Sequence, residues 1–301
     1  MEKNVALVLS SGGARGFAHI GAIKVLEQHG YSITSVAGTS MGALVGAIYA
    51  AGQLGEFEEW VRTLDVMEVL KLTDISLSSK GLVKGKKIIE KLKEIVPERT
   101  IEELHIPYCA VATNFIKGEE HVFTEGSLFN AIRASISIPT FFQPWKIGDD
   151  YFVDGGLVNP IPINRVKRGK DDLLVVVNVN ADIPYEGVPE EDKEKREEEK
   201  DSKFIRKVKE IQSKSEKQIP EDRKDEIGLF NLNNRSLSIM LNQIGSLTLK
   251  NYETDMMIEI SRQSFGTYDF YKAGEIIGEG ERAASRALEG DAARQDRPAV
   301  S

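Results

Sequence analysis

The chain has 301 residues, a hydrophobic fraction of 41% and a formal net charge of -8, and it contains one cysteine. This composition supports one large hydrophobic core or two smaller ones without disulfide bonds, because a single cysteine has no partner within its own chain. The acidic balance argues against nucleic-acid binding and against general attraction to an anionic membrane, so any membrane contact would have to be local and apolar.

The first residues, MEKNVALVLSSGG, lack the long apolar core and cleavage site of a signal peptide, and no segment offers the roughly 18 apolar residues of a membrane span. Cys109 lies in the apolar run IPYCAVAT and is interpreted as a small buried hydrophobic residue. We therefore expect a cytoplasmic protein, with any membrane contact transient and peripheral at the inner face of the membrane.

Predicted strands and helices alternate along the chain. The apolar run at 4–10 predicts a strand, and apolar residues at helical spacing in 17–30 predict a helix. Residues 32–40 and 41–52 repeat this pair. The later elements are predicted, in chain order, at helix 84–95, strands 107–115 and 120–124, helix 127–136, strands 173–180 and 256–261, and helix 274–290. This alternation predicts an α/β fold with a mainly parallel central sheet covered by helices on both faces.

One segment breaks the pattern. Residues 184–228 are dominated by alternating charges, and we interpret them as a solvated helix with disordered flanks, inserted into a single domain at 1–290. A role in partner docking or as a lid is the alternative. Residues 291–301 are predicted to form a disordered tail.

The stretch after this insertion, 234–252, has an apolar repeat. Leu237, Met240, Ile244 and Leu247 recur at helical spacing, which favours a core-facing helix over a membrane-facing one.

Ser40 lies in the pentapeptide GTSMG, which fits G-x-S-x-G between a predicted strand and a predicted helix. Gly38 and Gly42 leave room for a sharp turn, which would hold the hydroxyl exposed at a helix N-terminus. Free amides and the helix dipole favour developing negative charge there. The alternative is a tight turn in which Ser40 is an ordinary N-cap.

A serine nucleophile needs a base, and the histidines are poorly placed to supply it. In an α/β-hydrolase the histidine follows the acid along the chain. The four histidines, His19, His29, His105 and His121, all precede the best acid candidate, Asp154. His19 is expected to pack in the core or to support residues of the site.

The remaining candidate base is therefore a carboxylate. Asp154 follows a short apolar strand and precedes Gly155 and Gly156, a turn in which the backbone can approach a neighbouring loop closely. Facing Ser40, its carboxylate could take the hydroxyl proton, and partial burial would raise its pKa toward that task. A plain Asp-Gly turn is the alternative.

The first predicted turn supplies donors for an oxyanion. SSGGARG offers the amides of Gly12 and Gly13 at the start of a helix, with the positive charge of Arg15 nearby. The alternative is a dinucleotide-binding loop. It is disfavoured because Ser11 stands where the G-x-G-x-x-G pattern requires glycine, and because the second strand ends without the acidic residue expected for a ribose.

Together these motifs resemble the patatin-like phospholipase family, specifically its bacterial single-domain branch. SGGARG is similar to the family's oxyanion loop, GTSMG to its nucleophile elbow and DGG to its catalytic aspartate motif. RASISIPTFFQP resembles the segment that carries a characteristic proline, here Pro139. The resemblance spans about 5–179 and resumes in FGTYDFYKAGEIIGEGERAA. Ser11 departs from the family, in which many members have glycine at this position.

The resemblance implies a three-layer α/β/α fold and a Ser-Asp dyad without histidine. Ser40 would be the nucleophile and Asp154 its base. Gly12 and Gly13 would lend their amides to the oxyanion, with Arg15 supporting the loop or an anionic head group. The positions that support these motifs are five further glycines, one of them in the oxyanion loop, and one proline: Gly16, Gly38, Gly42, Gly155, Gly156 and Pro139.

The resemblance also implies a function, the hydrolysis of acyl esters of phospholipids or neutral lipids, with no metal and no cofactor. A lipase, thioesterase or acyltransferase stays open, because pocket walls decide substrate choice. The expected partner is a lipid substrate and not nucleic acid, and the oligomeric state is open. The alternative function is a catalytically weak scaffold that binds a partner through 184–228.

Overall fold

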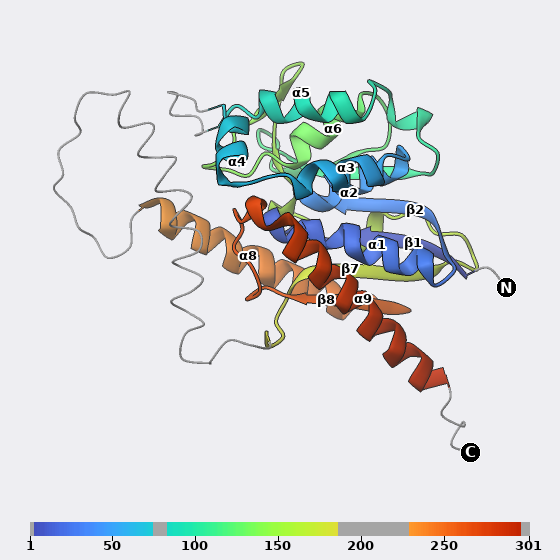
Figure 1. Ribbon diagram of the computed structural model, residues 1–301. Helices are drawn as coiled ribbons and strands as arrows, with labels where there is room; N and C mark the ends of the chain where they lie inside the picture. The colour runs from blue at the N-terminus through green and yellow to red at the C-terminus, as the bar shows by residue number, and fades with distance from the viewer. Residues whose placement is uncertain (1–2, 75–82, 186–228, 296–301) are drawn as a thin grey trace, which may run out of the picture.

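The computed structural model describes residues 3–74, 83–185 and 229–295 (Figure 1). Its centre is an eight-stranded sheet in the order β5-β6-β3-β2-β1-β7-β8, with β4 pairing with β3. The strands are β1 (Lys3–Leu9), β2 (Tyr31–Thr39), β3 (Tyr108–Asn114), β4 (Glu119–Phe123), β5 (Trp145–Ile147), β6 (Asp150–Asp154), β7 (Leu173–Ala181) and β8 (Met256–Ser261).

The sheet is mixed and mostly parallel, as the alternation of elements predicts. β8, β7, β1, β2 and β3 run parallel. β4 and β6 run antiparallel to β3, and β5 runs antiparallel to β6. The carboxyl ends of β1, β2 and β7 therefore meet at one edge of the sheet, where loops from distant parts of the sequence come together.

Helices cover the sheet on both faces (Figure 1). They are α1 (Ala18–Gln28), α2 (Met41–Ala50), α3 (Leu54–Arg62), α4 (Val66–Leu72), α5 (Lys86–Ile95), α6 (Leu128–Ser135), α8 (Leu229–Asn251) and α9 (Ala273–Gln295). Short 3-10 helices are η1 (Gly13–Phe17), η2 (Ile101–Glu103), η3 (Gly155–Leu157), η4 (Ile163–Arg165) and η6 (Phe270–Lys272).

Alternate residues of β1 belong to different hydrophobic clusters, because successive side chains of a strand point to opposite faces. Val5 and Leu7 lie in the main core, which also contains residues of α1, α2 and α9. Val8 faces the other side, where it packs with Ile161 and, through that cluster, with Leu249 of α8. The protein thus has the three layers that the sequence predicts.

The predicted strands and helices named above are all confirmed, with small shifts at their ends. α9 continues through residues 291–295, which we expected in a disordered tail, because the sequence DAARQ adds good helix formers after Gly290. α3 and α4 were not predicted. Apart from Pro184 and Tyr185, the charged insertion lies outside the described residues.

The expectation of a core-facing helix at 234–252 is wrong in part. Met240 and Leu247 are 52% and 56% exposed, whereas Leu237 and Ile244 are half-buried. The helix packs instead through a neighbouring face centred on Gly245, where an added Cβ would lie 3.3 Å from the Ile161 side chain. In the part of the chain that the structure describes, no helix has the length and apolarity to span a membrane.

Candidate active site

Ser40 stands on the turn between β2 and α2, with φ 55° and ψ -123°. A positive φ is unfavourable for any residue with a Cβ, and it persists only where the surroundings enforce it. Glycines on both sides make this turn feasible. A Cβ added to Gly38 would lie 2.4 Å from the Gly42 carbonyl oxygen, and a Cβ added to Gly42 would lie 2.3 Å from the Leu9 carbonyl oxygen. Ser40 occupies the N-cap position of α2, yet its side chain makes no capping hydrogen bond. The hydroxyl is therefore directed elsewhere.

The Ser40 hydroxyl donates to the carboxylate of Asp154, with 2.5 Å between Oγ and Oδ2. Asp154 ends β6 and pairs with Ala112 of β3, next to Val111, which pairs with Thr39 at the end of β2. The ends of β2 and β6 therefore meet on the same edge of β3, and this pairing sets the distance between Ser40 and Asp154. Both side chains are buried. The other carboxylate oxygen, Oδ1, accepts from the Gly156 amide at 2.8 Å. One oxygen thus serves the Asp-Gly turn while the other faces the serine.

Burial dominates the electrostatics of Asp154. Loss of solvent raises its pKa from 3.8 to about 6, and the hydrogen bonds from Ser40 and Gly156 oppose this rise because they favour the charged form. A carboxylate with a pKa near 6 is a stronger base than an exposed one and is still ionised at neutral pH.

Two serines that the sequence analysis did not single out position this pair. Ser135 accepts from the Ser40 amide at 2.8 Å and donates to the Val111 carbonyl at 2.6 Å. The Ser137 carbonyl accepts from the Asp154 amide at 2.9 Å. Both belong to the RASISIP segment before Pro139, so the Ser-x-Ser spacing beside that motif was the available signal.

The glycine-rich loop after β1 lies across the same cavity. Gly12 and Gly13 line it together with Ser40 and Asp154. The amides that flank the two glycines are already used, since Ser11 donates to Pro160 and Ala14 donates to Thr267, each at 2.8 Å.

Only glycine fits at these two positions. Gly13 has φ +56°, and an added Cβ would lie 2.5 Å from the Thr267 carbonyl oxygen. At Gly12 an added Cβ would lie 2.2 Å from Cγ2 of Val179. The loop is therefore held tightly between β7 and the segment after β8.

Arg15 supports this loop. Its guanidinium donates to the carbonyls of Val179 and Phe265 at 3.1 and 2.8 Å, and to the Asn180 side chain at 2.7 Å. Asn180 in turn donates to the Ser11 carbonyl at 2.5 Å. Of the two roles expected for Arg15, these bonds favour support of the loop.

The remaining motif positions pack at close range. An added Cβ at Gly16 would lie 2.4 Å from the Met41 Cβ, and one at Gly155 would lie 2.1 Å from the Val111 carbonyl oxygen. Pro139 lines the same cavity as Ser40. The predicted site residues, scattered from the first to the sixth strand, are thus gathered in one place.

The structure describes all four histidines, and none of them lines a cavity at Ser40. His19 is fully buried, and its Nε2 lies 2.9 Å from the Ser10 carbonyl oxygen. Burial lowers the pKa of His19 to about 4, which keeps the ring neutral. His19 therefore supports the glycine loop, as expected.

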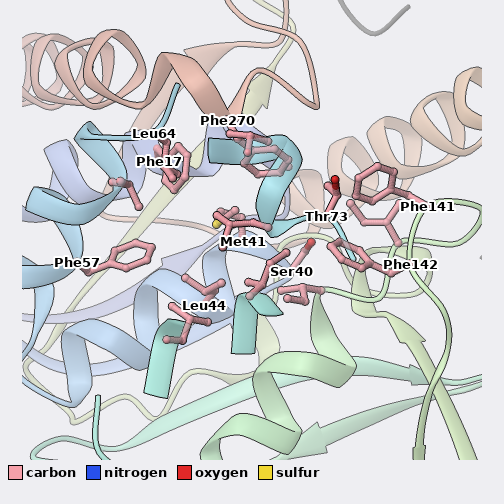
Figure 2. A pocket seen from close by; sticks show the side chains of 18 of the residues that line it. Phe17, Ser40, Met41, Leu44, Phe57, Leu64, Thr73, Phe141, Phe142 and Phe270 are labelled. Atoms are coloured by element: carbon pink, nitrogen blue, oxygen red, sulfur yellow. The ribbon is translucent and has the colours of Figure 1, made fainter. Parts of the chain in front are cut away.

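Two cavities meet at Ser40. The apolar cavity, of about 90 Å³, has no charged side chain among the described residues that line it (Figure 2). Its walls come from α2, α3, α4, α5 and neighbouring segments and include Phe17, Met41, Leu44, Phe57, Trp60, Leu64, Phe141, Phe142 and Phe270. The wide cavity, of about 360 Å³, is lined by Gly12, Gly13, Arg15, Asp154, Asn180 and residues of α8.

The described residues contain no group of three or more His, Cys, Asp or Glu side chains that could hold a metal ion.

Similarity to known proteins shows the family of this chain. A family model described as Patatin-like phospholipase matches residues 7–166. An uncharacterized NTE family protein of Mycobacterium tuberculosis is 34% identical over 331 residues, covering 95% of this chain and 91% of that protein.

Two further matches have lower sequence identity. Patatin-like phospholipase domain-containing protein 6 of Homo sapiens is 29% identical over 185 residues, which cover 59% of this chain and 13% of that protein. Among solved structures, VipD from Legionella pneumophila covers 96% of this chain and 67% of its own, with a TM-score of 0.47 and 16% identity.

Proposed function

The chain belongs to the patatin-like phospholipase family, and from this premise we propose that it is a metal-independent serine hydrolase that cleaves carboxylic acyl esters of lipids through Ser40 and Asp154. Family membership supports lipid hydrolysis in general. The observation that carries the finer proposal is the 2.5 Å hydrogen bond from the Ser40 hydroxyl to a buried carboxylate.

In the proposed first step, the Ser40 oxygen attacks the ester carbonyl carbon while Oδ2 of Asp154 takes the hydroxyl proton. The carbonyl oxygen becomes an oxyanion, to which the amides of Gly12 and Gly13 donate. When the tetrahedral intermediate collapses, the bond to the leaving alcohol breaks. Asp154 returns its proton to the alcohol oxygen, which leaves an acyl group on Ser40.

In the second step, water attacks the acyl carbon. Asp154 now takes a proton from the water as its oxygen bonds to the carbon, and the same amides stabilise the second oxyanion. Collapse expels the Ser40 oxygen, which recovers the proton from Asp154. The products are a free carboxylic acid and the regenerated hydroxyl.

The two cavities support a lipid substrate. A hydrocarbon chain gains about 0.8 kcal/mol for each CH2 group that it buries. The apolar cavity beginning at Ser40 offers such a site, because the described residues that line it are uncharged. The wide cavity, with Arg15 and Asn180 among its walls, would receive the polar part of the ester and the attacking water. The cytoplasmic location expected from the sequence is part of the same proposal.

The test is turnover of p-nitrophenyl esters with acyl chains from C4 to C12, in the presence of EDTA. We expect wild-type protein to hydrolyse them, and Ser40→Ala to be at least about 1,000-fold slower while keeping its circular dichroism spectrum and unfolding temperature. Ser32→Ala, on the same strand and distant from both cavities, is the control and should remain active.

Wild-type rates in folded Ser40→Ala would remove the assignment of the nucleophile. Turnover that EDTA abolishes and Zn²⁺ or Ca²⁺ restores would remove metal independence. Folded wild-type protein without turnover at any chain length would favour the scaffold alternative.

A further inference from the structure

The helix α8 has two different apolar sides. Its inner side lines the wide cavity with Leu237, Leu241 and Asn242, and the lining extends toward the other side at Leu232 and Ile239. Farther along, Leu249 packs against the hydrophobic cluster that contains Ile161 on the second face of the sheet. The inner side of α8 therefore faces other parts of the same protein.

The outer side is not covered by the described chain. Leu232, Ile239, Met240 and Leu247 are 50%, 52%, 52% and 56% exposed. At 100° per residue they fall within one arc of about 100° on the helix surface, opposite the side centred on Leu241. We call these four residues the outer stripe.

The outer stripe is unusual within the molecule. Eight large hydrophobic side chains are exposed in the described residues, and four of them belong to the outer stripe. Contiguous apolar side chains on a surface mark binding sites more often than scattered single ones do. The N-terminal turns of α8 also extend beyond the sheet (Figure 1).

The charge of α8 points to the kind of surface it meets. The helix contains no Asp or Glu, and its charged residues are Arg235 and Lys250, both exposed. The whole chain, by contrast, has a net charge of -8. A helix with an exposed apolar stripe, two basic residues and no acidic residue fits the boundary between head groups and acyl chains of an anionic bilayer.

We propose that the outer stripe of α8 docks on an anionic phospholipid bilayer and presents the wide cavity to it. The inference rests on the proposed lipid hydrolysis, because long-chain substrate resides in that bilayer. One helix then serves both steps: Met240 and Leu247, which line neither cavity, contact the lipid surface, while Leu232 and Ile239 of the same stripe also line the cavity that contains Ser40. A bilayer also requires no matching protein surface, whereas a second copy of the chain would have to bury a much larger area than one helical stripe.

The experiment is vesicle flotation with full-length protein and vesicles of either phosphatidylcholine alone or phosphatidylcholine with 25% phosphatidylglycerol. The test variant is Met240→Gln with Leu247→Gln, since neither residue lines a cavity. The matched control is Ser236→Gln with Ser246→Gln, which alters equally exposed polar positions of the same helix.

We expect wild type and the control to float with the anionic vesicles. The test variant should lose at least about tenfold in affinity, because it withdraws two large apolar side chains from the bilayer. Hydrolysis of p-nitrophenyl butyrate should stay unchanged in the test variant, while hydrolysis of phospholipid in vesicles should fall with binding.

Equal vesicle binding by wild type and test variant would overturn the inference, whatever the ester assay shows. A shift from dimer to monomer in the test variant, seen by sedimentation velocity without vesicles, would overturn it in favour of a second copy of the chain. If wild-type protein did not hydrolyse p-nitrophenyl butyrate, the proposed function would be refuted. Flotation would still test the membrane inference, because flotation does not depend on catalysis.

Discussion

The two cavities that meet at Ser40 differ in kind. The apolar cavity is narrow, and the described residues that line it are mostly aromatic or aliphatic and all uncharged, whereas the wide cavity holds Asp154, Arg15 and Gly12. The groups proposed for proton transfer therefore all lie on one side of the nucleophile. The other side selects by volume and hydrophobicity alone. Changes to the two cavities should accordingly alter different measured quantities by different amounts.

Removal of the base should have the largest effect. Asp154→Asn keeps the size of the side chain but cannot accept the hydroxyl proton, so kcat should fall about 100- to 10,000-fold at every acyl chain length. The measurement is turnover of the C4 and C12 p-nitrophenyl esters at pH 8. A loss confined to one chain length would contradict the separation of the two cavities.

The same substitution should stabilise the fold. Burial raises the pKa of Asp154 from 3.8 to about 6, so the folded state binds its proton more tightly than the unfolded state does. Stability is therefore lost as the pH rises from about 4 to 6, by about 3 kcal/mol at most. Urea unfolding should show Asp154→Asn to be more stable than wild type at pH 8, with the gain shrinking toward pH 4. If Asp154→Asn were no more stable than wild type at pH 8, burial of the ionised Asp154 carboxylate would not destabilise the fold as proposed.

The glycine loop should give the next largest effect. In Gly12→Ala the new Cβ would meet the Val179 side chain at 2.2 Å, which displaces the loop. Loss of an aligned oxyanion donor costs about 100- to 1,000-fold in kcat. The double variant Gly12→Ala with Val179→Ala removes the clash and should recover part of the rate. Failure of this rescue, with Val179→Ala alone active and folded, would contradict the steric explanation.

A change in the apolar cavity should alter chain-length preference and leave the chemistry intact. Leu44→Phe fills space beside Ser40, so kcat/KM for the C12 ester should fall about tenfold while the C4 ester is little affected. Trp60→Leu enlarges the same cavity and should shift the preference toward longer chains. Parallel losses for both esters in both variants would show that this cavity does not hold the acyl chain.

The smallest effect concerns pH. Because Asp154 must be ionised to act as a base and its pKa lies near 6, kcat/KM should be half-maximal at about pH 6 and level above it. Leu44→Phe should leave this midpoint in place. A midpoint near pH 4 would mean that the base is a solvent-exposed carboxylate.

The contrast between the cavities also explains how much of the site the sequence could predict. Ser40 and Asp154 lie in turns bordered by glycines, and such turns can be recognised as short motifs in the sequence. The strands that bring these residues together follow from the alternation of apolar runs. The apolar cavity has no sequence motif of its own, because its walls come from five or more elements, including the unpredicted α3 and α4.

α8 marks another limit. The spacing of Leu237, Met240, Ile244 and Leu247 predicts a helix correctly, since it reflects the helical period. It does not say what lies against each side, because a core, a membrane and a partner protein all favour the same residue types. Only the packing around Gly245 separates the inner side from the outer stripe.

The backbone at Gly42 lies very close to the backbone of the first turn, and this contact fixes the position of the nucleophile relative to the glycine loop. An added Cβ there would lie 2.3 and 2.6 Å from the carbonyl oxygens of Leu9 and Ser10, so the nucleophile turn and the glycine loop touch backbone to backbone. The interval between the attacking oxygen and the oxyanion donors is thus fixed by main-chain contacts, so substitutions of wall side chains outside these two turns should leave it unchanged. The walls are free to change for new substrates while the spacing of the reacting groups stays constant.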